Sequence, residues 1–214
     1  MRKISVLALA LALGACGGSS DSSPKPAGVS GTIMGSPFTP ADGGALAVPP
    51  FTCVPVAGTR SIAVLAMGFS SFSNVCGFAQ TAALCGDVMS SLLVTATILT
   101  SPATGTASPV GPGTYAIGTF ADGSGNLTQA GADITKVDGT CLPAAAIPTV
   151  SSGTITVASV SPRVSGSLDL TFSDGSRFAG AFDLAACSAT VDFCAIMSGT
   201  CATTHCCTSA TVCP

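Results

Sequence analysis

The sequence predicts an all-β fold, with an antiparallel β-sandwich as the expected architecture and a β-barrel as the alternative. From Val29 onward, short runs of Val, Ile, Leu, Thr and Phe are separated by Gly, Pro, Asp, Ser and Asn, a pattern typical of strands joined by turns. Polar and apolar residues alternate along these runs more clearly than they recur at helical spacing. Glu is absent and Lys is rare, so the strong helix formers are nearly missing.

The amino-terminal residues have the form of an export signal. Arg2 and Lys3 precede a run over residues 4–13 that is apolar except for Ser5 and is too short to cross a bilayer as a helix. The run ends in Leu-Gly-Ala-Cys at residues 13–16, which resembles the lipobox of bacterial lipoproteins. The resemblance implies that residues 1–15 are a signal peptide and that the mature chain begins at Cys16. Cys16 would carry a diacylglyceryl group on its thiol and an acyl chain such as palmitate on its amino group; an ordinary secretory signal is the alternative.

Residues 16–28 are expected to form the lipidated cysteine and a flexible tether, because Gly, Ser, Pro, Asp and Lys leave little to bury. Gly17, rather than Asp, follows the cysteine, which resembles Gram-negative sorting signals for the outer membrane. Two or more acyl chains hold a protein durably at a bilayer. We therefore expect a lipid-anchored protein of the outer membrane or cell surface, with the amino-terminal lipid as its membrane attachment.

A single β domain is expected over residues 29–187, followed by a cysteine-rich tail over residues 188–214. One short helix is considered within residues 76–89. The candidate strands, in chain order, cover residues 29–34, 60–68, 90–100, 113–120, 126–136, 153–160, 164–172 and 176–184.

The clearest element is a hairpin within residues 164–184. Apolar and polar residues alternate on both sides of Ser173-Asp174-Gly175, which indicates one buried face. A three-residue loop with Gly175 in the left-handed position keeps the two apolar sets on the same face. This register predicts three facing pairs: Leu170 with Phe178, Leu168 with Gly180, and Gly166 with Phe182. In the last two pairs, a glycine faces a large apolar residue.

A third strand upstream would complete a meander. If residues 161–164 form the connection, Ile155 faces Leu170 and Val157 faces Leu168. Residues 151–187 resemble the carboxy-terminal strands of uncharacterised exported lipoproteins of predatory Gram-negative bacteria. This resemblance implies a β-rich exported domain and assigns no activity, and it ends at Cys187, before the tail.

Eleven cysteines in an exported chain predict a disulfide framework. Ten cysteines are left when Cys16 is set aside. Five of them lie in the β domain, which we call the body, and five lie in the tail. If all of them pair, at least one bridge joins the tail to the body. Cys76 with Cys85 is the expected local pair, and adjacent Cys206 and Cys207 are expected to have different partners. The candidate disulfide cysteines are Cys53, Cys76, Cys85, Cys141, Cys187, Cys194, Cys201, Cys206, Cys207 and Cys213.

His205 is the one histidine of the chain. A serine hydrolase could use it as a base, but no Gly-x-Ser-x-Gly elbow is present. Zinc could be bound by His205 with Cys201, Cys206 and Cys207, but this spacing fits no common finger, and an oxidising compartment favours disulfides over thiolates. The favoured interpretation is an exposed imidazole in a disulfide-rich tail.

Three further patterns resemble functional sites. Residues 122–126, Asp-Gly-Ser-Gly-Asn, resemble the opening of a calcium loop, but no Glu can close it, so a turn between strands is favoured. Asp169 and Asp183 could form a glycosidase pair, yet both are expected on the polar face of the hairpin. Ser22 and Lys25 have the Ser-x-x-Lys spacing of acylating enzymes but lie in the tether.

Composition narrows the functions further. With 7 Lys and Arg against 10 Asp and a pI of about 4.7, the chain lacks the clustered cations that nucleic acids require. Sugar stacking is disfavoured by the absence of Trp and the single Tyr. We expect no cofactor, no metal and no catalytic residue, and a structural or interaction module whose partner is unidentified. A carrier of a small apolar ligand is the first alternative, and a hydrolase with an unrecognised site is the second.

Overall fold

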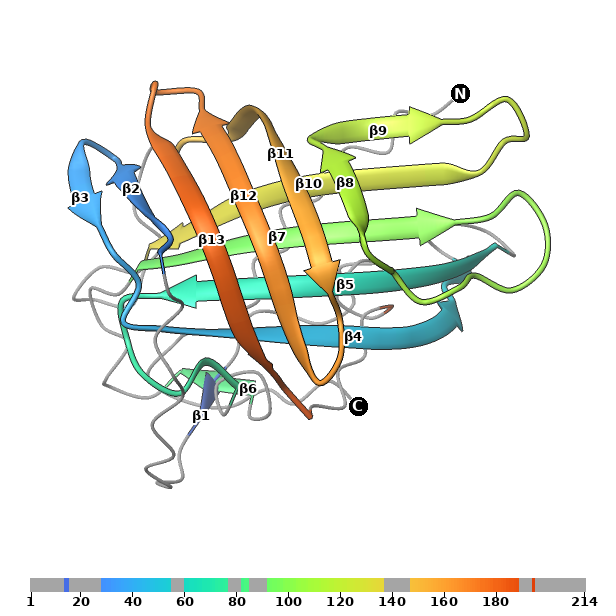
Figure 1. The fold of residues 1–214 in the computed structure, drawn as a ribbon, viewed down its shortest axis with the longest axis horizontal. Helices are drawn as coiled ribbons and strands as arrows, with labels where there is room; N and C mark the ends of the chain where they lie inside the picture. The colour runs from blue at the N-terminus through green and yellow to red at the C-terminus, as the bar shows by residue number, and fades with distance from the viewer. Residues whose placement is uncertain are drawn as a thin grey trace.

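The computed structural model of the protein describes residues 28–54, 60–76, 92–136 and 147–188, together with Cys194 (Figure 1). It also gives the backbone of two short strands that pair in parallel, β1 (Gly14–Ala15) and β6 (Ala82–Leu84). The other strands are β2 (Ser30–Ile33), β3 (Ser36–Phe38), β4 (Asp42–Thr52), β5 (Ser61–Ser70), β7 (Leu92–Ser101), β8 (Gly113–Ala116), β9 (Gly118–Ala121), β10 (Leu127–Lys136), β11 (Val150–Ser159), β12 (Arg163–Phe172) and β13 (Arg177–Ala186).

These eleven strands form one sheet that folds back on itself. Its order is β8-β11-β12-β13-β4-β5-β7-β10-β9, and the β2–β3 hairpin is attached to the first half of β13. Strands β11, β12 and β13 cross β4, β5, β7 and β10 at a wide angle, so the sheet makes two packed layers (Figure 1). The predicted all-β fold with a disulfide-bonded carboxy-terminal region is confirmed, in the form of a nearly closed, barrel-like sheet.

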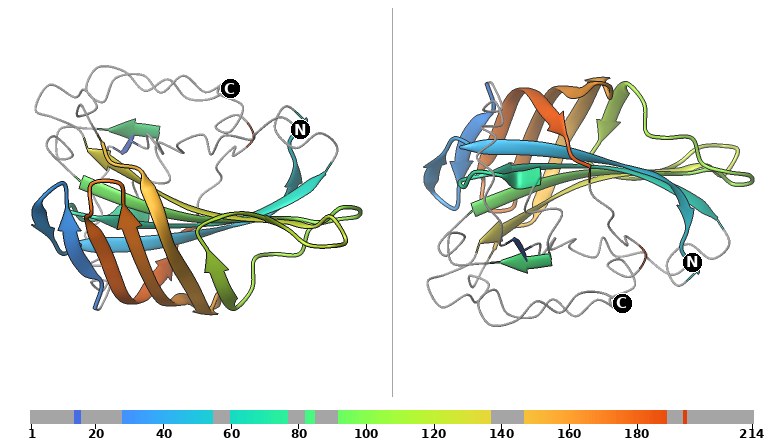
Figure 2. Two further views of the ribbon diagram at one scale, coloured as in Figure 1. Left: turned by 90° about the horizontal axis from the view of Figure 1, so that it is seen from above. Right: turned by 90° about the horizontal axis from the view of Figure 1, so that it is seen from below.

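The layers are joined at two corners. On one side, only Ile117 separates β8 from β9, so a single bent segment pairs first with β11 and then with β10. On the other side, the end of β13 pairs in parallel with the start of β4. The layer that contains β4, β5, β7 and β10 extends past the other layer at the end that carries the β9–β10 turn (Figure 2).

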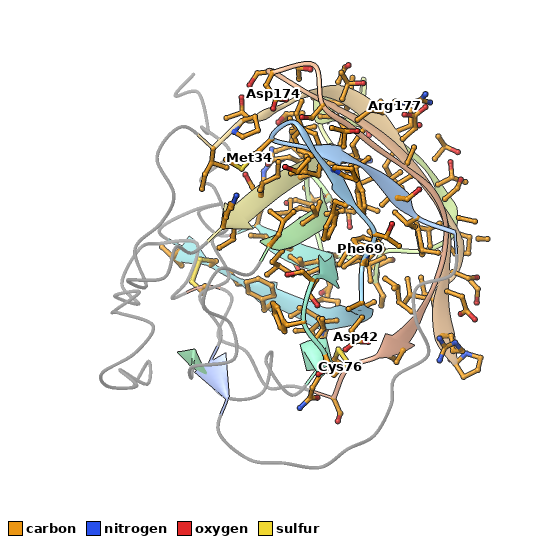
Figure 3. All side chains as sticks on the ribbon, turned by 90° about the vertical axis from the view of Figure 1, so that its left-hand side faces the viewer. Met34, Asp42, Phe69, Cys76, Asp174 and Arg177 are labelled. Carbon is orange, nitrogen blue, oxygen red and sulfur yellow. A yellow bond between two sulfur atoms is a disulfide. The ribbon has the colours of Figure 1, made fainter. Side chains whose placement is uncertain are left out.

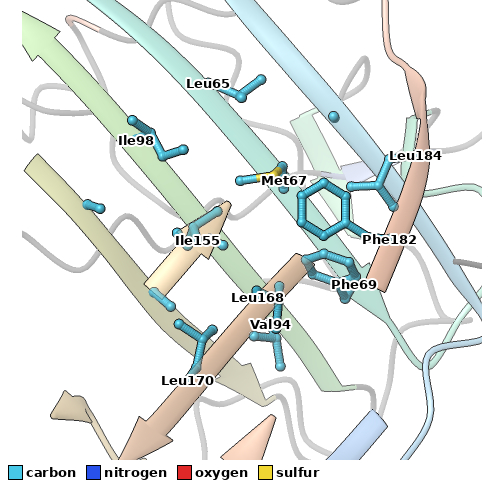
Figure 4. Close-up of a cluster of buried hydrophobic side chains, with 14 of the residues drawn as sticks. Leu65, Met67, Phe69, Val94, Ile98, Ile155, Leu168, Leu170, Phe182 and Leu184 are labelled. Carbon is cyan, nitrogen blue, oxygen red and sulfur yellow. The ribbon is translucent and has the colours of Figure 1, made fainter. Parts of the chain in front are cut away.

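The main core lies between the layers. One layer contributes Leu65, Met67, Phe69 and Ile98, and the other contributes Ile155, Leu168, Leu170, Phe182 and Leu184, all with 3% exposure or less (Figure 4). Side chains alternate inward and outward along these strands, as expected for sheets with a period of two. Burial of these inward sets is the main favourable contribution to folding.

The predicted hairpin is confirmed in its register. Leu170 is opposite Phe178, Leu168 is opposite Gly180, and Gly166 is opposite Phe182. The amide of Gly175 donates to the carbonyl of Phe172, and Gly175 has a φ of 80°, so it takes the left-handed position of the turn.

The predicted meander is present, but its register was wrong by two residues. Ile155 pairs with Leu168 rather than Leu170, and Val157 pairs with Gly166 rather than Leu168. The connection between β11 and β12 is shorter than expected, and a bulge between Val157 and Ser159 shifts the pairing. A shift of two residues keeps each side chain on the same face, so the buried set was still correct.

The sequence prediction missed two strands, and the structure tests only part of the stretch in which a short helix was considered. Strands β3 and β4 were not expected, because β4 contains Gly43-Gly44 and Pro49-Pro50, which resemble turn residues. The two prolines fall inside a bulge between Val48 and Phe51, where no ladder hydrogen bond is required of them. The helix considered within residues 76–89 is absent at Ala82–Leu84, which is strand β6, and most of the remaining stretch lies outside the described residues. Within the described part of the chain, no helix is long and apolar enough to span a membrane.

Candidate functional site: the disulfide-bonded face

Strand β5 is buried on both of its faces. Ala63, Leu65, Met67 and Phe69 point toward the other layer, whereas Ile62, Val64 and Ala66 point away from it. This second set joins Leu46 and Cys53 in a smaller apolar cluster, with Phe51, Cys187 and Cys194 packed against it. We call this side of β4 and β5 the disulfide-bonded face.

Two disulfides are attached to this face. Cys53 is bonded to Cys194, and Cys76 is bonded to Cys187. The first bridge joins the tail to the body, which is the kind of link that cysteine parity required. The expected local pair of Cys76 with Cys85 was wrong, because folding brings the end of β13 beside β4 and places Cys187 next to Cys76. The candidates that lie outside the described residues are Cys85, Cys141, Cys201, Cys206, Cys207 and Cys213.

The Cys76–Cys187 bridge lies directly on the backbone of β4. A Cβ atom placed on Gly44 would be 2.7 Å from the sulfur of Cys187 and 2.8 Å from that of Cys76. Gly68 is paired with Gly44 across the strands, and a Cβ there would be 3.1 Å from a methyl group of Val75. The two glycines therefore leave the space that Val75 and the disulfide fill.

Asp42 anchors the segment that carries Cys76. Its Oδ2 accepts a hydrogen bond from the amide of Val75 at 2.8 Å, and the residue is only 2% exposed. Its Oδ1 is buried and has no hydrogen-bond partner among the described residues. Figure 3 shows Asp42 and Cys76 beside each other at the edge of the described sheet. Sequence patterns did not single out Asp42, since an Asp before two glycines is typical of a turn.

The Asp122 turn is satisfied by its own hydrogen bonds. Asp122 Oδ1 accepts from the amides of Ser124 and Asn126 and from the Ser124 hydroxyl, while its Oδ2 accepts from the Asn126 side chain. These bonds, first those from the Ser124 and Asn126 side chains, lower the pKa of Asp122 to about 2. The side chain of Arg60 donates to the carbonyl of Gly125, which fixes the turn against the start of β5. The carboxylate is thus a structural acceptor in a tight turn.

Asp169 and Asp183 lie on the outer, polar face of the hairpin and are each bound to an arginine. Arg177 donates to both oxygens of Asp169, and Arg163 donates to Asp183 at 2.7 Å. The hydrogen bond from Arg177 lowers the pKa of Asp169. Both carboxylates are half exposed and paired with arginine, whereas the general acid of a glycosidase lies in a partly desolvated pocket.

The remaining predicted site residues lie outside the described residues. These are Cys16, Ser22, Lys25 and His205, together with Cys201, Cys206 and Cys207 of the zinc alternative. Within the described ranges, no group of three or more His, Cys, Asp or Glu side chains has a metal-binding arrangement.

Aromatic rings from the two layers contact each other in part of the core. Phe69 of β5 contacts Phe178 and Phe182 of β13, with ring centroids 5.4 and 6.1 Å apart in edge-to-face arrangements. Phe38 contacts Phe178 at 5.5 Å. The inward faces therefore meet directly through their own side chains.

Comparisons of the chain with protein-family models, with curated proteins and with solved structures gave no match.

Proposed function

We propose that the protein is a lipid-anchored lipoprotein of the outer membrane or cell surface whose β domain acts as a structural or interaction module. The observation that carries the proposal is the basic, apolar and Leu-Gly-Ala-Cys succession that ends at Cys16. The two disulfides support export, because disulfides persist in oxidising compartments. The acyl chains would supply the attachment, and the domain would be the part that meets a protein partner.

The contacts between the layers favour such a module over the carrier alternative. A carrier needs an apolar cavity, whereas Phe69, Phe178 and Phe182 meet across the interior. The arginine-bound carboxylates Asp169 and Asp183 also give less support to a glycosidase. We therefore rank the carrier second and a hydrolase third.

The anchor is tested by Cys16→Ser, with Ser20→Ala as the matched control in the tether. Since hydroxyl cannot accept the lipid in place of thiol, the Cys16→Ser protein should leave the membrane fraction, while Ser20→Ala should stay in it. The readout is the share of protein that sediments with washed membranes. Equal retention of both variants would contradict the lipid anchor.

A further inference from the structure

The two layers meet at a short pairing between β13 and β4, which we call the β4–β13 seam. Only Ala185 with Gly44 and Ala186 with Ala45 are paired there, and the amide of Cys187 donates to the carbonyl of Ala45 at 2.7 Å. The adjoining β12–β13 and β4–β5 ladders each contain nine residue pairs. Because few hydrogen bonds hold the seam, it is a place where local opening costs less than opening of a full ladder.

The Cys76–Cys187 disulfide lies across this seam. Cys187 directly follows β13, and Gly44 of β4 lies beneath both sulfur atoms. Cys76 and Cys187 are both partly exposed, whereas the other disulfide joins a partly exposed Cys194 to Cys53, which is fully buried with 0% exposure. Thiol–disulfide exchange requires access of a thiolate to a sulfur atom, so accessible disulfides are the labile ones.

The orphaned oxygen of Asp42 favours opening of the same region. Oδ1 of Asp42 has no hydrogen-bond partner among the described residues, so its burial destabilises the closed arrangement, and it regains hydrogen bonds when water reaches it. Asp42 accepts a hydrogen bond from the amide of Val75, the residue before Cys76, so release of Cys76 loosens the segment that Asp42 holds. The closed seam thus depends on the Cys76–Cys187 disulfide, which lies beside the unfavourably buried carboxylate of Asp42.

We propose that Cys76–Cys187 is a thiol–disulfide exchange site for a dithiol reductant and that its reduction opens the β4–β13 seam. One thiolate of the reductant attacks a sulfur of the bridge, the S–S bond breaks, and a mixed disulfide forms while the other cysteine leaves as a thiolate. The second thiolate of the reductant then displaces the first cysteine. The reductant becomes a disulfide, two electrons reach the protein, and the two protons of the reductant end on Cys76 and Cys187.

The first test uses the full chain and graded dithiothreitol under native conditions, with alkylation and peptide mapping of each cysteine. Cys76–Cys187 should be reduced at least about tenfold faster than Cys53–Cys194. At that stage, hydrogen exchange at the amides of Val75 and Cys187 should rise at least about tenfold, while amides in the middle of β5 stay protected. Equal reduction rates, or selective reduction without a change at these amides, would overturn the proposal.

Paired variants separate the seam from general destabilisation. We compare the double substitution Cys76→Ser and Cys187→Ser with the matched control Cys53→Ser and Cys194→Ser, each measured relative to its own β5 amides. Only the first variant should lose protection selectively at Val75 and Cys187. The same relative exchange in both variants contradicts the inference, and if the first variant fails to fold, the partly reduced native chain decides. The result does not depend on the lipid anchor, because every residue involved lies far along the sequence from Cys16, in the β domain or the tail that follows it.

Discussion

Gly166 of β12 lies against the backbone of β11. A Cβ atom at this position would be 1.9 Å from the carbonyl oxygen of Thr156 and 2.9 Å from the ring of Phe182. The backbone oxygen cannot move aside without breaking the ladder, so the side chain must be hydrogen. The alternating pattern of the hairpin already placed this glycine opposite a phenylalanine, and the structure adds the reason for its presence.

Gly166→Ala should therefore lower the free energy of unfolding by about 3 kcal/mol, since overpacking a rigid site displaces the backbone. Gly123→Ala is the matched control, because nothing lies within 4 Å of a Cβ placed there. Urea denaturation of both variants measures the difference. A loss for Gly166→Ala that does not exceed the loss for the control would show that the close approach is absent.

The hydrogen-bonded carboxyl group of Asp122 should make the stability of the protein depend on pH. The pKa of its carboxyl group is about 2 in the folded protein and 3.8 in the unfolded chain, so the folded state binds a proton at Asp122 less readily than the unfolded state does. The contribution of Asp122 to stability is complete above pH 3.8 and is lost as the pH falls from 3.8 toward 2. Carboxyl carbon NMR should find Asp122 ionised at pH 3; a midpoint near the ordinary value would contradict the hydrogen-bonded turn.

At the scale of elements, the β2–β3 hairpin depends on the turn between β12 and β13. The Ser176 hydroxyl accepts from the amide of Met34 at 3.1 Å and donates to Asp174 at 2.8 Å, and Ser176 is buried. Met34 has a φ of 52°, so it belongs to the tight turn of the β2–β3 hairpin. Figure 3 shows Met34 and Asp174 at the same end of the molecule.

Ser176→Ala should destabilise the protein by about 1 to 2 kcal/mol, because it leaves the Met34 amide without an acceptor. Ser167→Ala, on the exposed face of β12, is the control and should be nearly neutral. Thermal unfolding reports the stability, and exchange of the Met34 amide reports the hairpin. Unchanged exchange at Met34 in the Ser176→Ala variant would refute the link.

Elements that rest on local patterns were predictable, whereas those that depend on distant neighbours were not. The β12–β13 register follows from alternation and the Gly175 turn, both of which are local signals. Strand β4 was missed because Gly44 and Pro49 look like turn residues in the sequence. In the sheet, Gly44 makes room for the disulfide next to β13, and Pro49 lies in a bulge of the β4–β5 pair. The partner of Cys76 was missed for the same reason, since Cys187 is 111 residues away in the sequence.

At the scale of the whole molecule, the two disulfides connect distant parts of the chain. Cys53–Cys194 spans 141 residues and Cys76–Cys187 spans 111 residues. Long closed loops restrict the unfolded chain most in the entropic description of disulfides. Cysteine content predicted a disulfide framework, but the topology was needed to decide these pairs.

Replacing Cys53 and Cys194 by serine should reduce the free energy of unfolding by about 4 kcal/mol, because this bridge closes a loop of about 30 residues when the enclosed Cys76–Cys187 bridge is intact. Chemical denaturation under non-reducing conditions measures the loss. Cys53 is also part of the smaller apolar cluster, so Cys53→Ala with Cys194→Ala controls for the polarity of serine. Full stability in both double variants would mean that the bridge does not constrain the chain.

We propose that the whole molecule is a cross-linked β domain held at a membrane by lipid on Cys16. Peptide-mapping mass spectrometry of protein isolated from its native membrane, without reduction, tests this most directly. We predict an amino-terminal peptide that begins at Cys16 and carries acyl chains, together with cross-linked peptides that join Cys53 to Cys194 and Cys76 to Cys187. A mature chain that begins at another residue, or a Cys16 without lipid, would contradict the account.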